Sequence, residues 1–140
     1  MKLGLDIHGV IDSNPKLFLH IASQYDEVHI ITGGSFKDTK YDLVGDLIEL
    51  GHDALNRRTK WWDKEFSVFD YLLETQAKTN EELGVASHHP FPDETWNKVK
   101  ADYCREHEID LHIDDMEQYL TYFTTPYMLY KEPTRKHRGE

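Results

Sequence analysis

Several features of exported and membrane-bound proteins are scarce in this sequence. It has a single cysteine, Cys104, so it can form no internal disulfide and no metal site built on paired cysteines. No stretch of roughly 18 uncharged apolar residues is present, which argues against a membrane span. Asp6 and His8 interrupt the first apolar run before it reaches the length of a signal-peptide core. These absences predict a cytoplasmic protein without a membrane partner.

Basic residues are also few. The 140 residues include 16 Lys and Arg against 26 Asp and Glu, for a formal charge of −10 at pH 7. An acidic surface repels polyanions, which argues against a general electrostatic grip on nucleic acid. What is plentiful is apolar material: 39% of the residues are hydrophobic and 12% are aromatic, enough for one packed domain. We expect that domain over residues 1–130, followed by a polar tail at 131–140.

Short apolar runs alternate with helical patterns along the chain. Asn14-Pro15 is a typical helix start, Asp93 is expected to cap a later helix, and Gly51 is expected to end one. We predict strands at 2–7, 27–32, 54–57, 109–113 and 126–130, and helices after residue 14 and at 37–50, 64–76 and 94–106. The segment 79–92 is expected to be a loop. This alternation predicts an α/β fold: a Rossmann-like three-layer sandwich with a mostly parallel sheet of about five strands and helices on both faces.

Three predicted strands end in residues suited to metal and phosphate binding. Asp6 lies at the end of the first, Thr32-Gly33-Gly34 at the end of the second, and Asp114-Asp115 after the strand at 109–113. Ligands of open α/β sheets bind beyond these strand ends, so the residues should meet at one rim. Carboxylates gathered there need a cation, and oxygen ligands suit Mg²⁺. With a hydroxyl, backbone amides and a lysine nearby, the pattern predicts phosphoryl transfer with Asp6 as nucleophile.

The order of these residues resembles the haloacid dehalogenase (HAD) superfamily. Residues 6–12, Asp-Ile-His-Gly-Val-Ile-Asp, are similar to its DxDGxxx nucleophile loop, and residues 30–34, Ile-Ile-Thr-Gly-Gly, to its second motif. Lys98 or Lys100 corresponds to the third motif and Ile113-Asp114-Asp115 to the acidic fourth. Receiver domains use the same residue types, but there the acidic pair comes first in the chain. The order therefore favours the HAD superfamily.

The resemblance implies a role for each matched residue. Asp6 would attack phosphorus, helped by His8, Thr32 and Lys100. The implied Mg²⁺ ligands are Asp6, the backbone carbonyl of His8, Asp114 and Asp115, and the implied substrate-binding residues are Thr32, Gly33, Gly34, Lys100 and Lys98. Only one of the two lysines can face the site, because they point roughly 200° apart on a helix. We favour Lys100, which shares a helix face with Cys104 four residues on.

His8 departs from the family pattern, in which phosphatases usually have aspartate as the acid and base. An imidazole with a pKa of about 6.5 can serve the same purpose at neutral pH. We therefore expect a Mg²⁺-dependent phosphomonoester hydrolase that forms an aspartyl-phosphate, acting on a nucleotide or another small phosphorylated metabolite. Two alternatives stay open: action on a polynucleotide end, and a non-enzymatic module that binds metal or phosphate for regulation or interaction.

Little of the chain is left for a substrate-binding cap. Residues 12 to 32 hold little more than one helix and turns, so they leave no space for a cap domain after the first motif. Between the second and third motifs, at most a small helical lid at 57–92 fits beside the helix and strand that the sheet needs. We expect an enzyme with little or no cap, and no sequence feature indicates its oligomeric state.

Overall fold

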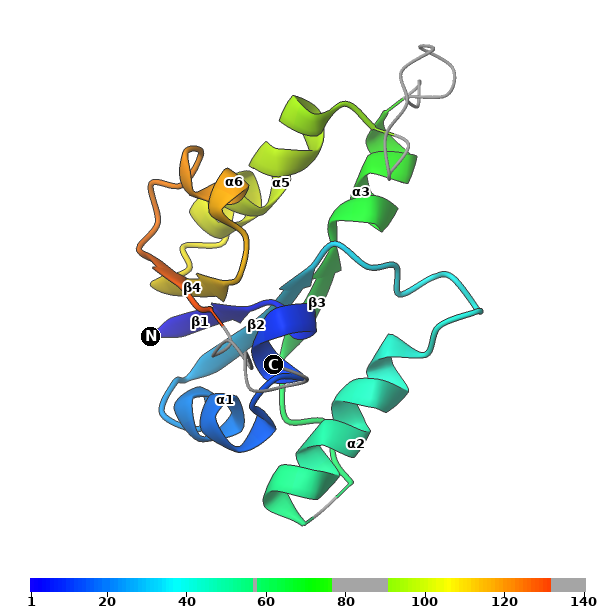
Figure 1. Cartoon of the computed structure of the whole chain (residues 1–140), viewed down its shortest axis with the longest axis vertical. Coiled ribbons are helices and arrows are strands. Elements are labelled where there is room, and N and C mark those ends of the chain that lie inside the picture. The colour runs from blue at the N-terminus through cyan, green and yellow to red at the C-terminus, as the bar shows by residue number, and fades with distance from the viewer. Residues whose placement is uncertain (57, 77–90, 132–140) are drawn as a thin grey trace, which may run out of the picture.

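A computed structural model of the chain describes residues 1–56, 58–76 and 91–131. Within them, five strands form one sheet in which every neighbouring pair is parallel, in the order β3-β2-β1-β4-β5 (Figure 1). The strands are β1 (Lys2–Leu5), β2 (Glu27–Thr32), β3 (Lys64–Ser67), β4 (Leu111–Asp114) and β5 (Tyr127–Leu129). The predicted α/β Rossmann-like sandwich is confirmed.

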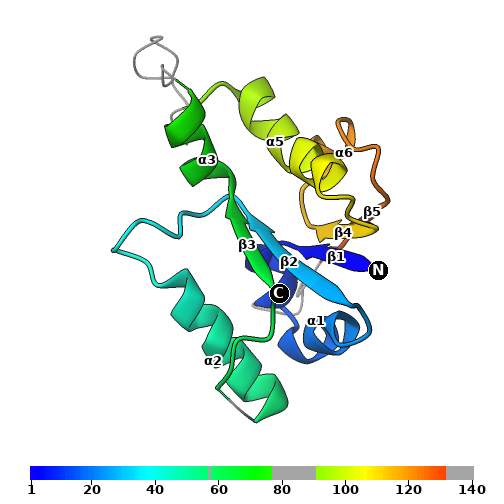
Figure 2. The ribbon, with the colours of Figure 1, turned by 180° about the vertical axis from the view of Figure 1, so that it is seen from behind.

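Helices cover both faces of the sheet. The helices α1 (Pro15–Ala22) and α2 (Leu43–Leu55) lie on one side, and α5 (Asp93–Glu106) lies on the other with α6 (Glu117–Leu120) (Figure 2). The helix α3 (Val68–Thr75) extends from the end of β3 and packs against α5. No helix among the described residues is long and apolar enough to cross a bilayer.

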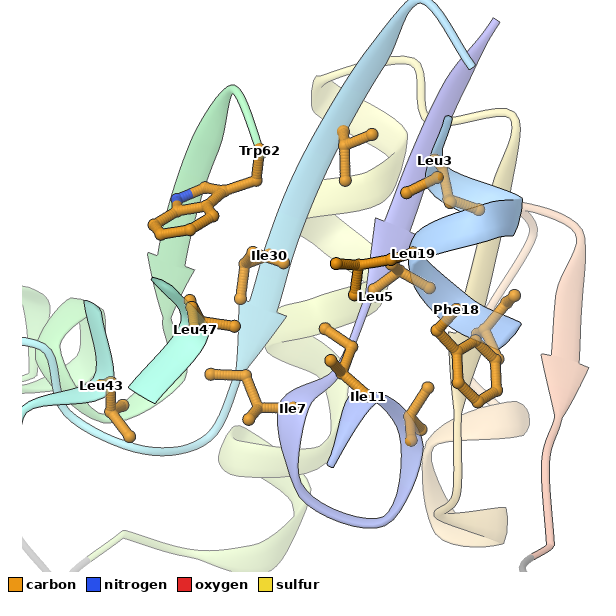
Figure 3. Close-up of a cluster of buried hydrophobic side chains, with 14 residues drawn as sticks. Leu3, Leu5, Ile7, Ile11, Phe18, Leu19, Ile30, Leu43, Leu47 and Trp62 are labelled. Atoms are coloured by element: carbon orange, nitrogen blue, oxygen red, sulfur yellow. The ribbon is translucent and has the colours of Figure 1, made fainter. Parts of the chain in front are cut away.

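The main core lies between the sheet and the first pair of helices. Leu3, Leu5 and Ile30 point from β1 and β2 toward Phe18 of α1 and Leu47 of α2, and all five are buried (Figure 3). A second buried cluster fills the other face, where the chain contributes Ile31, Tyr103, Cys104 and Ile109. Successive strand residues point to opposite faces, which explains why Ile30 and Ile31, neighbours on β2, belong to different clusters.

Two predictions in the middle of the chain are wrong. Residues 54 and 55, expected in a strand at 54–57, belong to α2, and the third strand is β3, expected as the start of a helix at 64–76. A strand at the sheet edge tolerates charge, so Lys64 and Glu65 are exposed there and give no apolar run to recognise. The helix begins only at Val68, because the Ser67 hydroxyl accepts a hydrogen bond from the Asp70 amide at 3.0 Å.

Gly51 does not end its helix as predicted. The helix α2 starts at Leu43 rather than at 37 and runs to Leu55, where Asn56 takes up a left-handed conformation with φ of 56°. Gly51 is buried inside the helix, where a Cβ would come within 2.6 Å of Cδ1 of Trp61. The Trp61 indole donates to the Leu47 carbonyl at 2.8 Å. The lack of a side chain at Gly51 therefore leaves room for the Trp61 indole, and α2 continues past this glycine to Leu55.

The remaining boundaries shift by a few residues. The strand expected at 2–7 ends at Leu5, and those expected at 109–113 and 126–130 are β4 and β5. Asp93 is the first residue of α5 rather than its cap, which is Pro92. Of the possible lid at 57–92, residues 64–67 are a strand of the sheet, and residues 57 and 77–90 lie outside the described residues, as does the tail beyond 131.

Candidate active site

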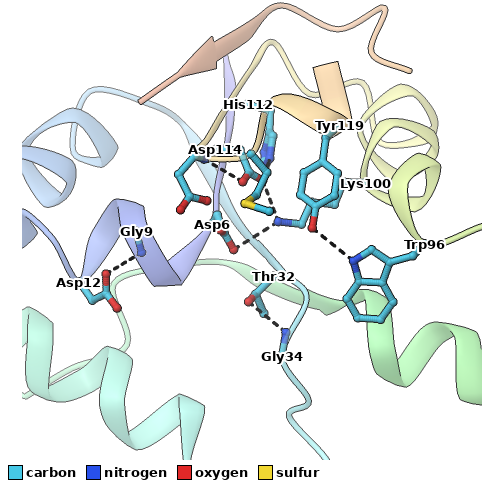
Figure 4. Close-up of polar contacts among 12 residues, drawn as sticks. Asp6, Gly9, Asp12, Thr32, Gly34, Trp96, Lys100, His112, Asp114 and Tyr119 are labelled. Atoms are coloured by element: carbon cyan, nitrogen blue, oxygen red, sulfur yellow. Dashed lines mark hydrogen bonds and ion pairs between the residues drawn. The ribbon is translucent and has the colours of Figure 1, made fainter. Parts of the chain in front are cut away.

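Three carboxylates meet where the strand order of the sheet reverses. Asp6 directly follows β1, Asp114 ends the neighbouring strand β4, and Asp115 comes next (Figure 4). One oxygen from each side chain lies within 4.8 Å of the others. The crevice beyond the carboxyl ends of strands at such a reversal is the general ligand site of open α/β sheets. The structure thus brings together the three side chains predicted as metal ligands.

Lys100 inserts its ammonium between two of these carboxylates. Its Nζ atom lies 3.2 Å from Oδ1 of Asp6 and 2.7 Å from Oδ2 of Asp114, and only 2% of the side chain is exposed. Lys98, two residues earlier on α5, is exposed. Helix geometry separates the two side chains by roughly 200°, so the face of α5 that packs on the sheet carries Lys100 alone. Of the two candidate lysines, the structure brings only Lys100 to the site.

Burial and charge set the protonation of this cluster. Burial raises the pKa of Asp6 to about 7, because Lys100 only partly offsets the loss of water and the repulsion from Asp114 and Asp115. Burial would also raise the pKa of Asp114, but Lys100 and a hydrogen bond from His112 hold it below its ordinary value. Burial disfavours the Lys100 ammonium, yet the two facing carboxylates raise its pKa. The site therefore has a charged Lys100–Asp114 pair beside a carboxyl of near-neutral pKa.

The Asp114 carboxylate accepts hydrogen bonds at both of its oxygens. Its Oδ2 atom also accepts from Nε2 of His112, at 2.8 Å, and its Oδ1 atom accepts from the Asp115 amide at 2.8 Å. His112 is fully buried, and burial lowers its pKa, which leaves the ring neutral. No sequence motif points to His112, although its position two residues before Asp114 on one strand places both side chains on the same face. The hydrogen bond from His112 thus fixes the orientation of the Asp114 carboxylate.

Lys100 contacts one aromatic ring, and a second aromatic residue holds that ring in place. The Nζ atom of Lys100 lies 4.9 Å from the ring centre of Tyr119, within the range of a cation–π contact. The Trp96 indole donates a hydrogen bond to the Tyr119 hydroxyl at 3.2 Å, which holds that ring in place (Figure 4). Neither residue follows from the sequence motifs, because their approach depends on how α5 packs against α6. The Tyr119 ring thus covers one side of the buried ammonium.

The turn η1 (Ile7–Ile11), which follows Asp6, carries His8, the third residue of the motif at residues 6–12. Gly9 has a φ of +82°, a left-handed conformation that favours glycine, and its amide donates to Oδ1 of Asp12 at 2.8 Å. The other oxygen of Asp12 lies 3.1 Å from Nδ1 of His8, whose side chain is 67% exposed. Asp12 therefore holds both the turn and the imidazole. Gly9 also faces Asp115, because a Cβ at position 9 would collide with Oδ2 of that carboxylate.

Thr32 and the two glycines lie on the same rim. Thr32 ends β2, the strand next to β1, and is buried, while its Oγ1 atom accepts from the Gly34 amide at 3.3 Å (Figure 4). Gly33 and Gly34 are half-buried at the start of the loop that follows. All of the predicted site residues except Lys98 thus belong to this rim or its bordering turn.

Asp70 is a residue that the sequence analysis missed. Its buried carboxylate, from the first turn of α3, accepts hydrogen bonds from the hydroxyl of Ser35 and from the amides of Phe36 and Lys37, the last two at 2.8 and 3.2 Å. These contacts fix the loop that follows Gly34. The spacing Ser67-x-x-Asp70 is a helix-start signal and could have located the residue, but not its contacts with the loop.

The donor set fits a divalent cation. Asp6, Asp114 and Asp115 offer only oxygen ligands, which Mg²⁺ prefers, and neighbouring waters or backbone carbonyls commonly complete its shell. When ionised, three carboxylates and one ammonium leave two formal negative charges in a largely buried cluster. A divalent ion would balance them, and its charge would favour the ionised form of Asp6, whose pKa is raised mainly by burial and further by the repulsion from Asp114 and Asp115.

No family model matches the chain, and no curated protein or solved structure matches it. The case for an activity therefore rests on the residues of the rim and their geometry.

Proposed function

We propose that the chain is a Mg²⁺-dependent phosphomonoester hydrolase of the HAD type, with Asp6 as its nucleophile. The observation that supports this most is the carboxylate cluster itself: Asp6, Asp114 and Asp115 offer oxygens within 4.8 Å, and Lys100 is buried between the first two. A buried charged cluster at a strand-end crevice is typical of a functional site. The order of the four motifs supplies the reaction class.

Asp6 carries the covalent chemistry in this proposal. One carboxylate oxygen attacks phosphorus, a P–O bond to Asp6 forms, and the P–O bond to the alcohol breaks. Water then attacks the same phosphorus, the bond to Asp6 breaks, and inorganic phosphate leaves. The ionised form of Asp6 is the nucleophile, and Lys100 favours that form because its ammonium lies 3.2 Å from Oδ1.

Asp6, Asp114, Asp115 and the backbone carbonyl of His8 would hold Mg²⁺, which supplies positive charge against the phosphoryl group. His112 and the Asp115 amide fix the orientation of Asp114 through the hydrogen bonds described above. The Thr32 hydroxyl and the Gly33 amide can donate to phosphoryl oxygens, and the Gly34 amide, which donates to Oγ1 of Thr32, would hold that hydroxyl in position.

His8 is the proposed acid and base. Its Nε2 atom would give a proton to the departing alcohol oxygen and later take one from the attacking water. The contact of Nδ1 with Asp12, at 3.1 Å, leaves the second ring nitrogen for this purpose. A carboxylate that orients an imidazole in this way is a recurrent catalytic arrangement. The exposed side chain can reach a substrate bound at the rim, and we propose a nucleotide or another small phosphorylated metabolite as that substrate.

A non-enzymatic role is the second candidate, and the histidine at position 8 is the observation that favours it. If the imidazole fails to replace aspartate, the same cluster would bind Mg²⁺ or a phosphorylated ligand without turnover. Trapping separates the two candidates: an adduct of fluoroberyllate on Asp6 in the presence of Mg²⁺, together with turnover of an aryl phosphate, supports the enzyme. Metal binding without either result supports the module.

The test of the proposed function is a panel of phosphomonoesters assayed with Mg²⁺ and with EDTA. We expect release of inorganic phosphate that requires Mg²⁺ and disappears in Asp6→Asn. Hydrolysis at the same rate in EDTA would contradict the metal site. Hydrolysis by Asp6→Asn at the wild-type rate would contradict the nucleophile.

A further inference from the structure

A cavity adjoins the candidate site on the side of His8. It has a volume of about 270 Å³ and shares His8, Gly33 and Gly34 with the site, while Tyr41, Leu43 and Phe69 form its outer walls. Because His8 and the two glycines border both spaces, a phosphoryl group on the rim would direct the remainder of its ester into this cavity. The volume is at the low end for small-molecule sites, which suits one ring system better than a long chain.

The walls of the cavity favour an apolar, flat group. Tyr41 and Phe69 contribute aromatic rings and Leu43 an aliphatic side chain, whereas the backbone of the two glycines presents little bulk. Tyr41 is 64% exposed, so its ring has most of its surface available for a bound partner. Aromatic rings stack on other rings in offset or edge-to-face arrangements, and such stacking accepts any flat partner.

The charge of the cavity disfavours a second anionic group. Asp38 and Ser35 are its other lining residues, and none of the described lining residues is Lys or Arg. A further phosphate on the leaving group would lie near the Asp38 carboxylate without a cation to balance it. A neutral group, or one with a hydroxyl or a ring N–H that can donate to the Asp38 carboxylate, meets no such repulsion.

The loop that forms one wall is held in place before any ligand binds. Asp70 accepts from Ser35, Phe36 and Lys37, and the Ser35 hydroxyl in turn accepts from the amides of Lys37 and Asp38 at 3.1 and 3.0 Å. Three of these five hydrogen bonds tie residues 35–37 to Asp70 of α3, and the other two order residues 35–38 from within the loop. Pre-ordering of this kind lowers the entropy that binding must overcome.

We propose that this cavity binds the leaving group of the substrate, and that this group is neutral and carries a ring. The substrates would then be monophosphate esters of aryl-type or nucleoside-type alcohols, and not bisphosphates or esters of short alkyl alcohols. This inference rests on the proposed function and adds the substrate class. Asp70 is a positioning residue in it, because it acts through the loop and touches no part of the ester.

The experiment compares benzyl phosphate with ethyl phosphate in the presence of Mg²⁺, because both esters have primary alcohols as leaving groups and only one has a ring. We expect kcat/KM for benzyl phosphate to exceed that for ethyl phosphate by about tenfold or more, a preference that burial of one ring can supply. In Tyr41→Ala this ratio should fall several-fold, mainly through KM. Tyr71→Ala is the matched control: this exposed tyrosine of α3 does not line the cavity, and its variant should keep the wild-type ratio.

A second arm tests the charge argument with a nucleoside 5′-monophosphate and its 3′,5′-bisphosphate. The wild type should prefer the monophosphate, and Asp38→Lys should reduce that preference. Circular dichroism of each variant verifies its fold. Equal rates for benzyl and ethyl phosphate, or a ratio unchanged by Tyr41→Ala, would overturn the leaving-group site and leave the proposed function standing. No Mg²⁺-dependent hydrolysis of any of these esters would overturn both.

Discussion

The ammonium of Lys100 lies 2.7 Å from Oδ2 of Asp114, and 2% of the lysine side chain and none of the aspartate side chain is exposed. Removing two charges from water is costly, and a buried pair is stabilising only when its remaining hydrogen-bonding groups are satisfied. Here His112, the Asp115 amide and the Tyr119 ring supply those contacts. The pair holds a fixed positive charge beside Asp6.

The first prediction concerns the proposed nucleophile. Asp6→Asn should lower kcat at least a thousandfold, because an amide oxygen cannot form the acyl-phosphate, while the protein stays folded. Phosphate release with Mg²⁺ measures this effect. Asp53→Asn, the same substitution at an exposed position of α2, should leave kcat unchanged. A variant at position 6 that retains wild-type turnover would remove Asp6 from the mechanism.

The second prediction separates the two lysines. Lys100→Met leaves Asp6 and Asp114 facing each other without a buried cation, and it should cost about 3–5 kcal/mol in the free energy of unfolding and at least 100-fold in kcat. Lys98→Met, on the exposed face of the same helix, should change stability by less than about 0.5 kcal/mol. Urea denaturation and turnover measure both effects. The opposite pattern, with only the Lys98 variant inactive, would reverse the assignment.

A third prediction follows from the protonation of Asp6 in metal-free protein. Burial raises its pKa from 3.8 to about 7, so the folded chain keeps a proton that the unfolded chain releases near pH 4. Stability should therefore fall as the pH rises from about 4 to about 7 and then level off. Asp6→Asn removes this loss, and in EDTA it should exceed the wild type in stability by on the order of 2–4 kcal/mol at pH 8, with a smaller gap at pH 5.

Urea denaturation at the two pH values measures that gap, and addition of Mg²⁺ should narrow or reverse it, because the ion binds more tightly to the chain that retains all three carboxylates. A gap of equal size at pH 5 and pH 8 would contradict the raised pKa. Asp53→Asn again serves as the control for the loss of one carboxylate.

The fourth prediction concerns the turn at Gly9. Gly9→Ala places a methyl group against Oδ2 of Asp115 and strains a backbone with φ of +82°. It should weaken Mg²⁺ binding by tenfold or more, as measured by calorimetry, because one of the three carboxylates is displaced. Ala54→Gly, in α2 and away from the site, is the control for a mild backbone change. Gly45→Ala cannot serve this purpose, because a Cβ at position 45 would collide with Asp42. Unchanged affinity would mean that Asp115 does not bind the ion.

The fifth prediction tests the pairing of His8 with Asp12. His8→Ala should lower kcat by about 100-fold or more, in the range of general acid–base catalysis, whereas His8→Asp should keep or raise it. Asp12→Ala should lower kcat in the wild type but have a smaller effect in the His8→Ala background, because only its contact with the Gly9 amide, and no longer its contact with the imidazole, is then lost. Additive losses in the double variant would show that Asp12 acts independently of His8.

The strands that carry the site could be predicted from the sequence to within a few residues. Asp6 directly follows β1, and Thr32 and Asp114 end β2 and β4. Because parallel strands deliver their carboxyl ends to one edge, the placement of these residues at that edge follows from the strand pattern, whereas the strand order that makes them neighbours does not. The choice of Lys100 over Lys98 also follows from a local argument, since one helix face must pack on the sheet.

Features set by tertiary packing could not be predicted in the same way. The edge strand β3 begins with Lys64 and Glu65, so it lacks the apolar alternation that usually marks a strand. Its pairing with β2 is what makes it a strand, and that pairing is a tertiary contact. Gly51 looks the same in sequence whether it ends a helix or admits Trp61. Asp70 holds a loop more than thirty residues earlier in the chain, and that relation exists only once α3 is in place.

The pairing of β1 with β4 has a consequence for the folding kinetics. Leu3 lies opposite Leu111, so the two strands that carry Asp6 and Asp114 can pair only after more than a hundred intervening residues have been brought into a closed loop. Contacts of such long range form slowly. We therefore expect the cluster of Asp6, Asp114 and Asp115 to form late in folding. The Mg²⁺ proposed to bind there should then act mainly on the rate of unfolding: chelation would shorten the lifetime of the native state far more than it would slow its formation.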